Sequence, residues 1–242
     1  MGGDLLGRRE TNLGPGRLAH ICRRHRSTIW KVLHRHGVSR RRVVPEPVGR
    51  RRYEWSRPGA LIHVDTAKLA RFDQPGHRTR GRSSETPRSY GAGRSALHVA
   101  IDDHSRYAYV EIHTDERGET CARFAERALA HFADLGMDQV EALMSDNALN
   151  YRRSLAFQGV LARRGIRHIL TPPYTPRWNG KCEPFIQTLK AEWAYAHEWP
   201  SSATRARALS SWLRTYNRQR RHSSLGDRPP ISRVPNLCEQ RS

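Results

Sequence analysis

The sequence predicts an α/β fold: a mixed five-stranded sheet with helices on both faces, preceded by a small helical unit. Short apolar, β-branched runs are typical of strands, and longer segments with apolar residues every three or four positions are typical of helices. Three strands come first, and helices then alternate with strands. The expected strands are 61–68, 96–102, 107–113, 140–145 and 167–170, and the expected helices are 118–135, 153–164, 181–197 and 202–217.

The charge of the chain is strongly positive. Its 242 residues are enough for one core of ordinary size and a small appendage. The formal net charge is +20, with 39 arginines and 4 lysines. A GC-rich gene explains the preference for arginine equally well, but it does not explain the excess of basic over acidic residues. That excess indicates a polyanionic partner, namely double-stranded DNA, bound in a steeply salt-dependent way.

Two other classes of protein are disfavoured: membrane or secreted proteins, and proteins held together by zinc or disulfides. No apolar run approaches the roughly 20 residues of a membrane span, and the N-terminus lacks the apolar core of a signal peptide. Cys22, Cys121, Cys182 and Cys238 form no CxxC pair, which indicates free thiols rather than a zinc site or a disulfide framework. We therefore expect a cytoplasmic protein, associated with the nucleoid and without a membrane partner.

Residues 1–40 are predicted to form a helix-turn-helix unit. Ser27 is a natural N-cap for its second helix and Gly37 a natural stop. That helix would direct Thr28, Lys31 and Arg35 outward, as a recognition helix does in the major groove. The alternative is an ordinary helical hairpin with a solvated basic face. Because the segment before the first helix is short and rich in glycine, we also expect the chain to be truncated at its N-terminus.

The remaining chain divides into three predicted parts. Residues 41–58 form a proline-containing basic linker, in which Arg51 and Arg52 are expected to contact phosphates. Residues 59–200 form the core, and residues 201–242 form a C-terminal helix and basic tail. Within the core, segment 71–95 is rich in Arg, Gly, Ser and Pro and is expected to be a mobile hairpin loop that becomes ordered on DNA.

Three acidic residues carry the chemical prediction. Asp65 lies in the first strand, Asp146 directly follows the fourth, and Glu183 leads an amphipathic helix. If the two strands are neighbours, all three carboxylates can converge on one point. Such a cluster repels itself unless cations neutralise it, and oxygen ligands suit Mg²⁺ or Mn²⁺. Two ions in one site can clamp the attacking and leaving oxygens of a phosphodiester.

Each acid also has a simpler explanation. An Asp after a strand often caps a turn, and for Asp146 alone that explanation would carry about half the weight. Asp102 and Asp103 compete with the three acids, because they also end a strand. Since they are followed by His104 and Ser105 and then by a new strand, a tight turn explains them better.

The helix that Glu183 leads has a polar face. Glu183, Gln187 and Lys190 fall within about 60° of one another at 100° per residue. We expect Gln187 and Lys190 to contact DNA near the cut, the alternative being a solvated helix face. Pro184 disturbs this arrangement, because proline pushes the residue before it away from helical dihedral angles. Either the helix begins at Pro184 with Glu183 as its cap, or Glu183 is displaced.

Five motifs in order resemble those of the DDE transposases of bacterial insertion sequences. They are HVDTAKL (63–69), LHVAIDDHSRYAYVEI (97–112), SDN (145–147), TPPYTPRWNGKCEPFIQTLKAEW (171–193) and YNRQRRHSSLGDRPP (216–230). The resemblance implies a ribonuclease-H-like integrase core and a catalytic, metal-binding triad of Asp65, Asp146 and Glu183. It also implies metal-dependent cleavage and strand transfer at transposon ends by a homo-oligomer. The last motif contains Arg221 and His222, in either a phosphate-binding corner or a structural clasp.

Three competing functions remain. A truncated or inactive copy would bind DNA without cutting it, which the short N-terminus and Pro184 favour. A ribonuclease H acting on RNA–DNA hybrids is disfavoured by the basic linker and the N-terminal unit. A tyrosine recombinase is disfavoured because neither Tyr151 nor Tyr216 has the supporting Arg-His-Arg arrangement.

Overall fold

The computed structural model describes residues 15, 18–19, 22–39, 54–73, 93–171 and 180–235. The chain forms two compact units, Met1–Tyr53 and Glu54–Ser242, and each is described by itself. The second unit starts at Glu54, whereas the sequence suggested a core from residue 59. In the part of the chain that the structure describes, no helix is long and apolar enough to cross a bilayer.

The N-terminal unit is built around helix α3, Arg26–Arg35. Leu18, Ile29 and Leu33 are fully buried against one another, so one face of α3 holds this small core. Gly37 has a φ of 68°, the left-handed conformation that ends helices, as predicted. The helical residues before α3 are only partly described, and a helix-turn-helix remains a prediction.

The N-cap of α3 differs from the predicted one. The cap is His25, whose ring Nδ1 accepts a hydrogen bond from the backbone N–H of Ser27. Ser27 lies inside the first turn, and its hydroxyl is 2.7 Å from the same His25 nitrogen. An imidazole nitrogen accepts the capping hydrogen bond here in place of the usual hydroxyl or carboxylate oxygen. The common N-cap preferences therefore predicted the wrong residue.

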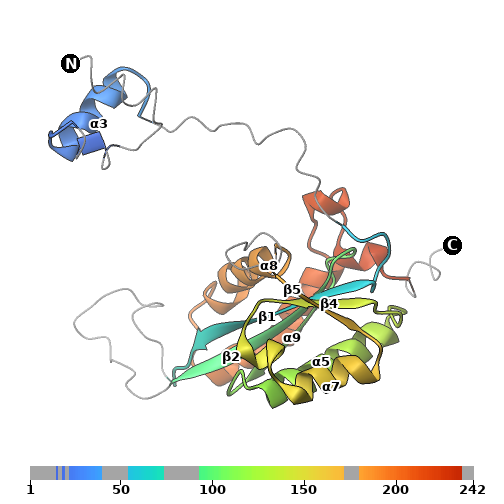
Figure 1. Ribbon diagram of the computed structural model, residues 1–242. Coiled ribbons are helices and arrows are strands. Elements are labelled where there is room, and N and C mark those ends of the chain that lie inside the picture. Colours follow the sequence, from blue (N-terminus) through green and yellow to red (C-terminus); the bar gives the residue numbers. More distant parts are fainter. Residues whose placement is uncertain are drawn as a thin grey trace. The chain divides into compact units, whose positions relative to one another are not determined.

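The second unit contains the predicted five-stranded sheet (Figure 1). Its order is β3-β2-β1-β4-β5; β1 pairs antiparallel with β2 and parallel with β4, and β4 pairs parallel with β5. The strands are β1 Leu61–Ala70, β2 Arg94–Asp102, β3 Ala108–His113, β4 Ala142–Ser145 and β5 Arg167–Leu170. Arg94 and Ser95 belong to β2, where they pair with Ala70 and Leu69, and not to the loop predicted at 71–95. Most of that loop, 74–92, lies outside the described residues.

The helices of this unit also agree with the prediction, with two differences. They are α5 Gly118–Asp134, α6 Leu149–Arg152, α7 Leu155–Arg163, α8 Cys182–Leu189 and α9 Ser202–Arg218, followed by the 3₁₀ turns Ser223–Leu225 and Pro230–Arg233. The helix expected at 153–164 is α7, whose N-cap Ser154 accepts a bond from the N–H of Phe157, and the short helix α6 before it was not predicted. After Leu189 the chain continues as a π-helix, Lys190–Ala194, instead of a uniform α-helix.

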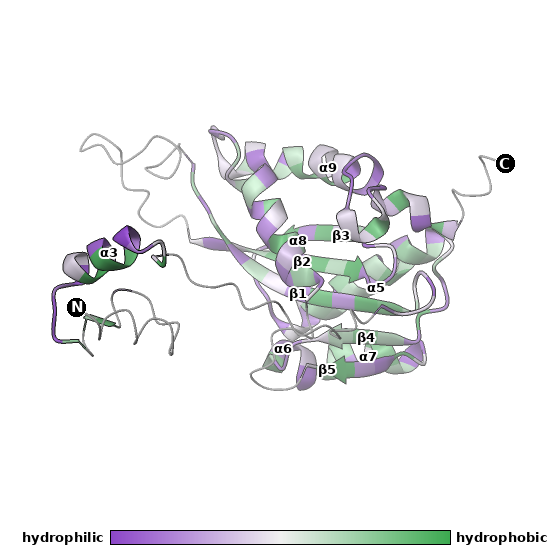
Figure 2. Cartoon of the chain, turned by 90° about the horizontal axis from the view of Figure 1, so that it is seen from above, coloured by the Kyte–Doolittle hydropathy of each residue, from purple (hydrophilic) through white to green (hydrophobic). Residues whose placement is uncertain are grey.

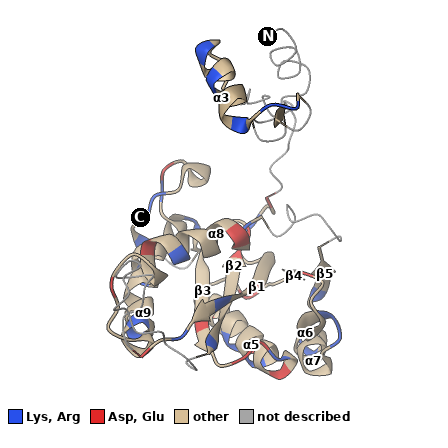
Figure 3. Ribbon diagram, turned by 90° about the vertical axis from the view of Figure 1, so that its left-hand side faces the viewer, with Lys and Arg blue, Asp and Glu red and all other residues tan. Residues whose placement is uncertain are grey.

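The sheet separates two apolar cores, and Figure 2 shows apolar residues along its strands. Side chains alternate along β1. Ile62 and Val64 pack with α5 and α7 on one face, whereas Leu69 packs with α8 and α9 on the other. Figure 3 shows α8 and α5 on opposite sides of the sheet. Because Asp65 has the same parity as Leu69, its side chain lies on the face that α8 covers.

Candidate active site

Two of the predicted carboxylates lie side by side because of strand register. In the parallel pair, Leu61 is opposite Ala142 and His63 is opposite Met144. Continuing this register by two residues brings Asp65 level with Asp146, on the same face of the sheet. The structure therefore brings together two residues that are far apart in the sequence.

The third carboxylate is placed over this point by helix α8. Cys182, Phe185 and Leu189 are buried in the core between α8 and the sheet. This packing leaves Glu183, in the first helical turn, on the exposed side. Figure 3 shows acidic residues at this end of α8.

Pro184 does not prevent the helix from forming around Glu183. The helix starts at Cys182, so Pro184 lies in its first turn and Glu183 is already helical. Backbone N–H groups in a first turn have no partner within the helix, so the missing N–H of proline costs little there. The first alternative expected from the sequence, a helix that begins at Pro184 with Glu183 as its cap, is therefore wrong.

Electrostatic effects link all three acids. The pKa of Asp65 is raised to about 7, chiefly by burial and in smaller part by the negative charges of Asp146 and Glu183. The opposing influences are the backbone N–H of Thr66, which donates to Asp65 Oδ1 over 2.7 Å, and the positive charge of Lys190. Asp65 is therefore the acid at which the mutual repulsion is concentrated.

Asp146 also has a local structural role. Its Oδ1 accepts a 3.0 Å bond from the N–H of Ala148, as in a carboxylate-capped turn. The side chain of Asn147 donates to the carbonyl of Thr171, which follows β5. The simpler explanation for an Asp in this position is thus partly correct. The turn fixes the direction of the Asp146 carboxylate and leaves its second oxygen for another ligand.

Two neutral side chains lie beneath the acids. Burial raises the pKa of the Cys182 thiol well above its usual range, and the charges of Asp65 and Glu183 act in the same direction. Burial likewise raises the pKa of the Tyr151 hydroxyl, with the nearby charge of Cys121 and those of Asp65 and Asp146 adding to the effect. These groups stay protonated and make the inner side of the site poor in water. Nothing in the sequence pattern indicated this role.

The three acids are suited to a divalent ion by their chemistry, but they are not closed around one. Among the described residues, no three His, Cys, Asp or Glu side chains lie close enough together to hold a metal ion. Mg²⁺ commonly binds one or two carboxylates and completes its shell with water and substrate phosphates. Asp65 and Asp146, with the exposed Glu183 opposite them, fit that pattern.

The residues predicted to contact DNA fall into four groups. Thr28, Lys31 and Arg35 are exposed on α3, and Gln187 is exposed and Lys190 half-buried on the helix that carries Glu183. Arg51 and Arg52 lie outside the described residues.

The last group is in the C-terminal turn. Arg221 is exposed, whereas the ring of His222 packs on Tyr216 with centroids 4.9 Å apart. Burial, together with the charges of Arg220 and Arg106, lowers the pKa of His222 to about 4, so the ring is uncharged near neutral pH. Its contacts are those of a structural clasp, and Arg221 remains the residue able to bind phosphate.

The two acids that competed in the sequence, Asp102 and Asp103, do form a tight turn. Asp102 accepts 2.6 Å bonds from both the N–H and the hydroxyl of Ser105. Both acids are fully buried, and Asp103 makes contacts far beyond the turn, which the sequence did not indicate. Burial alone would raise the pKa of Asp103, but hydrogen bonds from His63 and the Trp55 N–H and the charge of Lys181 outweigh it and lower the pKa.

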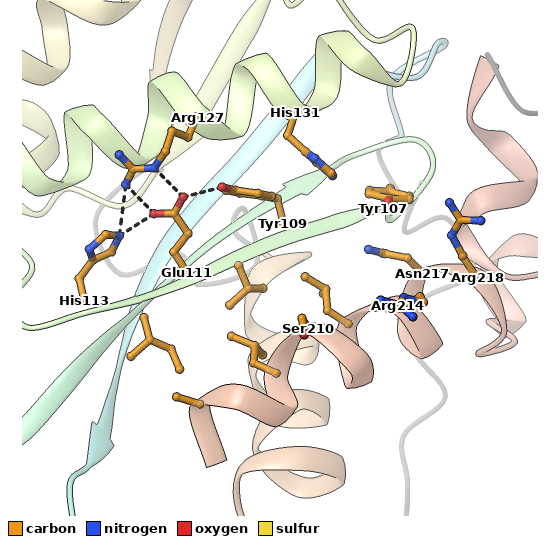
Figure 4. Close-up of a pocket in the computed structure, with 15 residues that line it drawn as sticks. Tyr107, Tyr109, Glu111, His113, Arg127, His131, Ser210, Arg214, Asn217 and Arg218 are labelled. Carbon is orange, nitrogen blue, oxygen red and sulfur yellow. Dashed lines mark hydrogen bonds and ion pairs between the residues drawn. The ribbon is translucent and has the colours of Figure 1, made fainter. Parts of the chain in front are cut away.

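A cavity of about 890 Å³ lies at the other end of this sheet, between β3, α5 and α9 (Figure 4). On its wall Glu111 accepts bonds of 2.8 and 2.6 Å from Arg127, and it also bonds Tyr109 and His113. Burial alone would raise the pKa of Glu111, but these bonds lower it to about 2. None of the three predicted catalytic acids lines this cavity.

Comparison with known families assigns the second unit. Two models, each described as an integrase core domain, match residues 56–176 and 164–230. The first alone spans half of the chain. This chain belongs to the integrase core family. The predicted integrase-core fold is thereby confirmed, and the matched ranges include Asp65, Asp146 and Glu183.

Solved structures also resemble this integrase core protein. A simian T-cell lymphotropic virus intasome, in complex with the PP2A regulatory subunit B56 gamma, matches with a TM-score of 0.58 and 17% identity, over 95% of this chain and 73% of that chain. The catalytic core domain of BIV integrase matches with a TM-score of 0.49 and 16% identity, over 75% of this chain and 97% of that chain. The HTLV-2 integrase catalytic core domain in complex with magnesium matches with a TM-score of 0.49 and 15% identity, over 74% of this chain and 98% of that chain. At such identity the likeness to the intasome chain shows a shared fold and nothing finer.

Proposed function

We propose that this integrase core protein is a DDE-type transposase that cleaves the ends of an insertion sequence and joins them to target DNA with Mg²⁺ or Mn²⁺. One observation carries the proposal: β1, the end of β4 and the start of α8 bring the half-buried Asp65 near two further carboxylates, and burial together with their charges raises its pKa to about 7. Perturbed acids of this kind are typical of functional sites. A raised carboxyl pKa is also expected at a cation site when no cation neutralises the negative charges of its carboxylates.

In this proposal each residue has a defined role. Asp65 and Asp146 hold the ions from the sheet, and Glu183 holds them from the facing helix. When bound, the divalent ions neutralise the carboxylates and the scissile phosphate and make water or a 3′-hydroxyl a stronger nucleophile. Lys190 and Gln187 position the DNA backbone, and the buried Cys182 and Tyr151 keep water away from the inner side.

The partners are double-stranded DNA and further copies of the chain. The net charge of +20 supports the first. The exposed Thr28, Lys31 and Arg35 would add contacts from the N-terminal unit. Solved relatives include a dimeric form and an intasome assembly, which supports the second.

The test is cleavage of duplex DNA that carries the element's own ends. Asp65→Asn, Asp146→Asn and Glu183→Gln should each reduce the rate by about 10³-fold or more while DNA binding persists. Glu192→Gln is the matched control, because Glu192 lies in the π-helix that continues α8 and pairs with Arg220 instead. Full activity in all three triad variants would remove the metal–carboxylate mechanism.

A second candidate is a DNA-binding protein without catalysis. It is favoured by the finding that the described acids are not close enough to hold an ion between three of them. Binding of the transposon ends with no cleavage, in either Mg²⁺ or Mn²⁺, would support this function over the first.

A further inference from the structure

Several polar contacts outside the three predicted catalytic acids converge on the buried carboxylate of Asp103. It accepts hydrogen bonds from the backbone N–H of Trp55 over 2.7 Å and from His63 Nε2 over 2.9 Å. The ammonium of Lys181 lies 3.5 Å from it, and a guanidinium nitrogen of Arg106 lies 3.9 Å from it. Both His63 and Asp103 are fully buried.

Two of these partners are adjacent to the predicted catalytic acids. His63 is on β1, two residues before Asp65 and on the same face of the sheet. Lys181 is the N-cap residue of α8, two residues before Glu183. The Asp103 carboxylate thus contacts the residue two positions before Asp65 in the sheet and the residue two positions before Glu183 in α8.

We propose that Asp103 is a positioning residue that fixes the start of α8 against β1 and thereby sets how Glu183 faces Asp65. This inference rests on the proposed function, because it assumes that those two acids act together.

The way α8 begins makes such a contact necessary. The helix has no side-chain cap hydrogen bond at its N-terminus. Its other anchors, Phe185, Ile186 and Leu189, are apolar, and apolar packing is not directional. A charge-assisted contact is directional. The Lys181–Asp103 pair therefore limits sliding and rotation of the first turn, which carries Glu183.

The sheet side of this contact is equally dependent on Asp103. His63 Nδ1 is buried and has no hydrogen-bond partner among the described residues. The bond from Nε2 to Asp103 is thus what orients this ring. Asp103 itself is held on a rigid turn, because its neighbour Asp102 bonds Ser105 and the N–H of Gly59.

A general stabilising role is the alternative, and Asp102 offers a matched control. Asp102 is equally buried and lies in the same turn, but within the described residues its carboxylate accepts hydrogen bonds from Ser105 and Gly59 and none from α8. Asp102→Asn should therefore weaken the fold without a specific effect on α8. Lys181→Met removes the helix side of the Asp103 contact, and Lys181→Arg restores a cation there.

The experiment uses the full chain and three readouts. Hydrogen exchange of α8 is measured without metal or DNA, Mn²⁺ binding by electron paramagnetic resonance, and cleavage as kcat separately from the Kd for DNA. Lys181→Met and Asp103→Asn should speed exchange in α8 and weaken Mn²⁺ binding, each by about 10-fold, and lower kcat by about 10- to 100-fold. The Kd for DNA should stay within about 2-fold, and Lys181→Arg should recover most of the loss.

The outcomes separate this inference from the proposed function. If the wild-type chain cleaves no DNA, the proposed function fails, and exchange in α8 still decides the role of Asp103. Unchanged exchange in both Lys181→Met and Asp103→Asn would overturn the inference. So would the same pattern of losses in Asp102→Asn, because the effect would then be that of a weakened turn.

Discussion

The sheet carries two groups of acidic side chains whose surroundings shift the carboxyl pKa in opposite directions. At the β3 edge, Glu111 is surrounded by Arg127, Tyr109 and His113, and its pKa falls to about 2. On β1, the half-buried Asp65 lies near other carboxylates, and its pKa rises to about 7. One carboxylate is stabilised as an ion, and the other is destabilised as an ion.

The difference separates an acid that stabilises the fold from one that we propose to be catalytic. Hydrogen bonds to the ionised form of Glu111 tie β3 to α5 and stabilise the folded chain. Asp65 lowers stability whenever it is ionised, so folding alone gives no reason for it to be acidic. Such a site is stabilised only when something else supplies positive charge. The following experiments test that contrast, from the largest expected effect to the smallest.

Removing the cation at the β3 edge should cost stability and leave the chemistry intact. Arg127→Met should lower the free energy of unfolding by about 2 kcal/mol, a value discounted because Arg127 is half exposed. The measurement is urea unfolding, with the cleavage rate of the folded variant as the control. A loss of cleavage without a loss of stability would contradict the assignment of this cluster as structural.

Removing the charge of Asp65 should raise the free energy of unfolding instead of lowering it. The unfolded state loses this proton near pH 4 and the folded state near pH 7, so ionisation of Asp65 lowers stability progressively across that interval. In EDTA at pH 8, Asp65→Asn should therefore be more stable than the wild type by on the order of 2 kcal/mol, and the difference should vanish at pH 4.

The same pH series contains an internal comparison. Glu111 has a lower pKa folded than unfolded, so its contribution is complete above about pH 4.5 and is lost as the pH falls toward 2. The wild type and Asp65→Asn should lose the stabilisation from Glu111 to the same extent in acid. A pH-independent difference between wild type and Asp65→Asn would show that Asp65 is not the strained group.

Divalent ions should stabilise the wild type and not the triad variants. Mg²⁺ at about ten times its dissociation constant should add about 1.4 kcal/mol and raise Tm by a few degrees. Asp65→Asn and Glu183→Gln should show a much smaller shift, and Glu192→Gln should behave as the wild type does. Equal shifts in all of these proteins would place the ion elsewhere.

The smallest effect is expected at Pro184. Because it lies in the first turn of α8, Pro184→Ala should change the free energy of unfolding by less than about 0.5 kcal/mol and leave the cleavage rate unchanged. A larger loss would mean that the ring itself fixes the position of Glu183.

The sequence predicted the sheet well because its strands depend on local patterns, and the triad stays a prediction. β1 and β4 are short apolar runs, and a carboxylate within or directly after such a run is easy to recognise. The same patterns placed Phe185 and Leu189 in the core and left Glu183 and Gln187 exposed, as the structure has them.

Features that depend on tertiary contact were missed. A tight turn explains Asp103 locally, so nothing in the sequence indicated that it reaches His63 and Lys181. The cap of α3 was assigned to Ser27 because histidine is an uncommon cap. The π-helix that begins at Lys190 has no recognisable sequence signal, although such segments are frequent at functional sites.

The parallel register of β1 and β4 has a consequence for how copies of such a gene decay. Losing one codon between Leu61 and Asp65 would turn the carboxylate toward α5 and separate it from Asp146, without disturbing the reading frame. Losing a codon in a surface connection between the strands would leave the two acids level. If the proposed function holds, inactive and active copies of the gene should therefore differ more in strand length than in loop length.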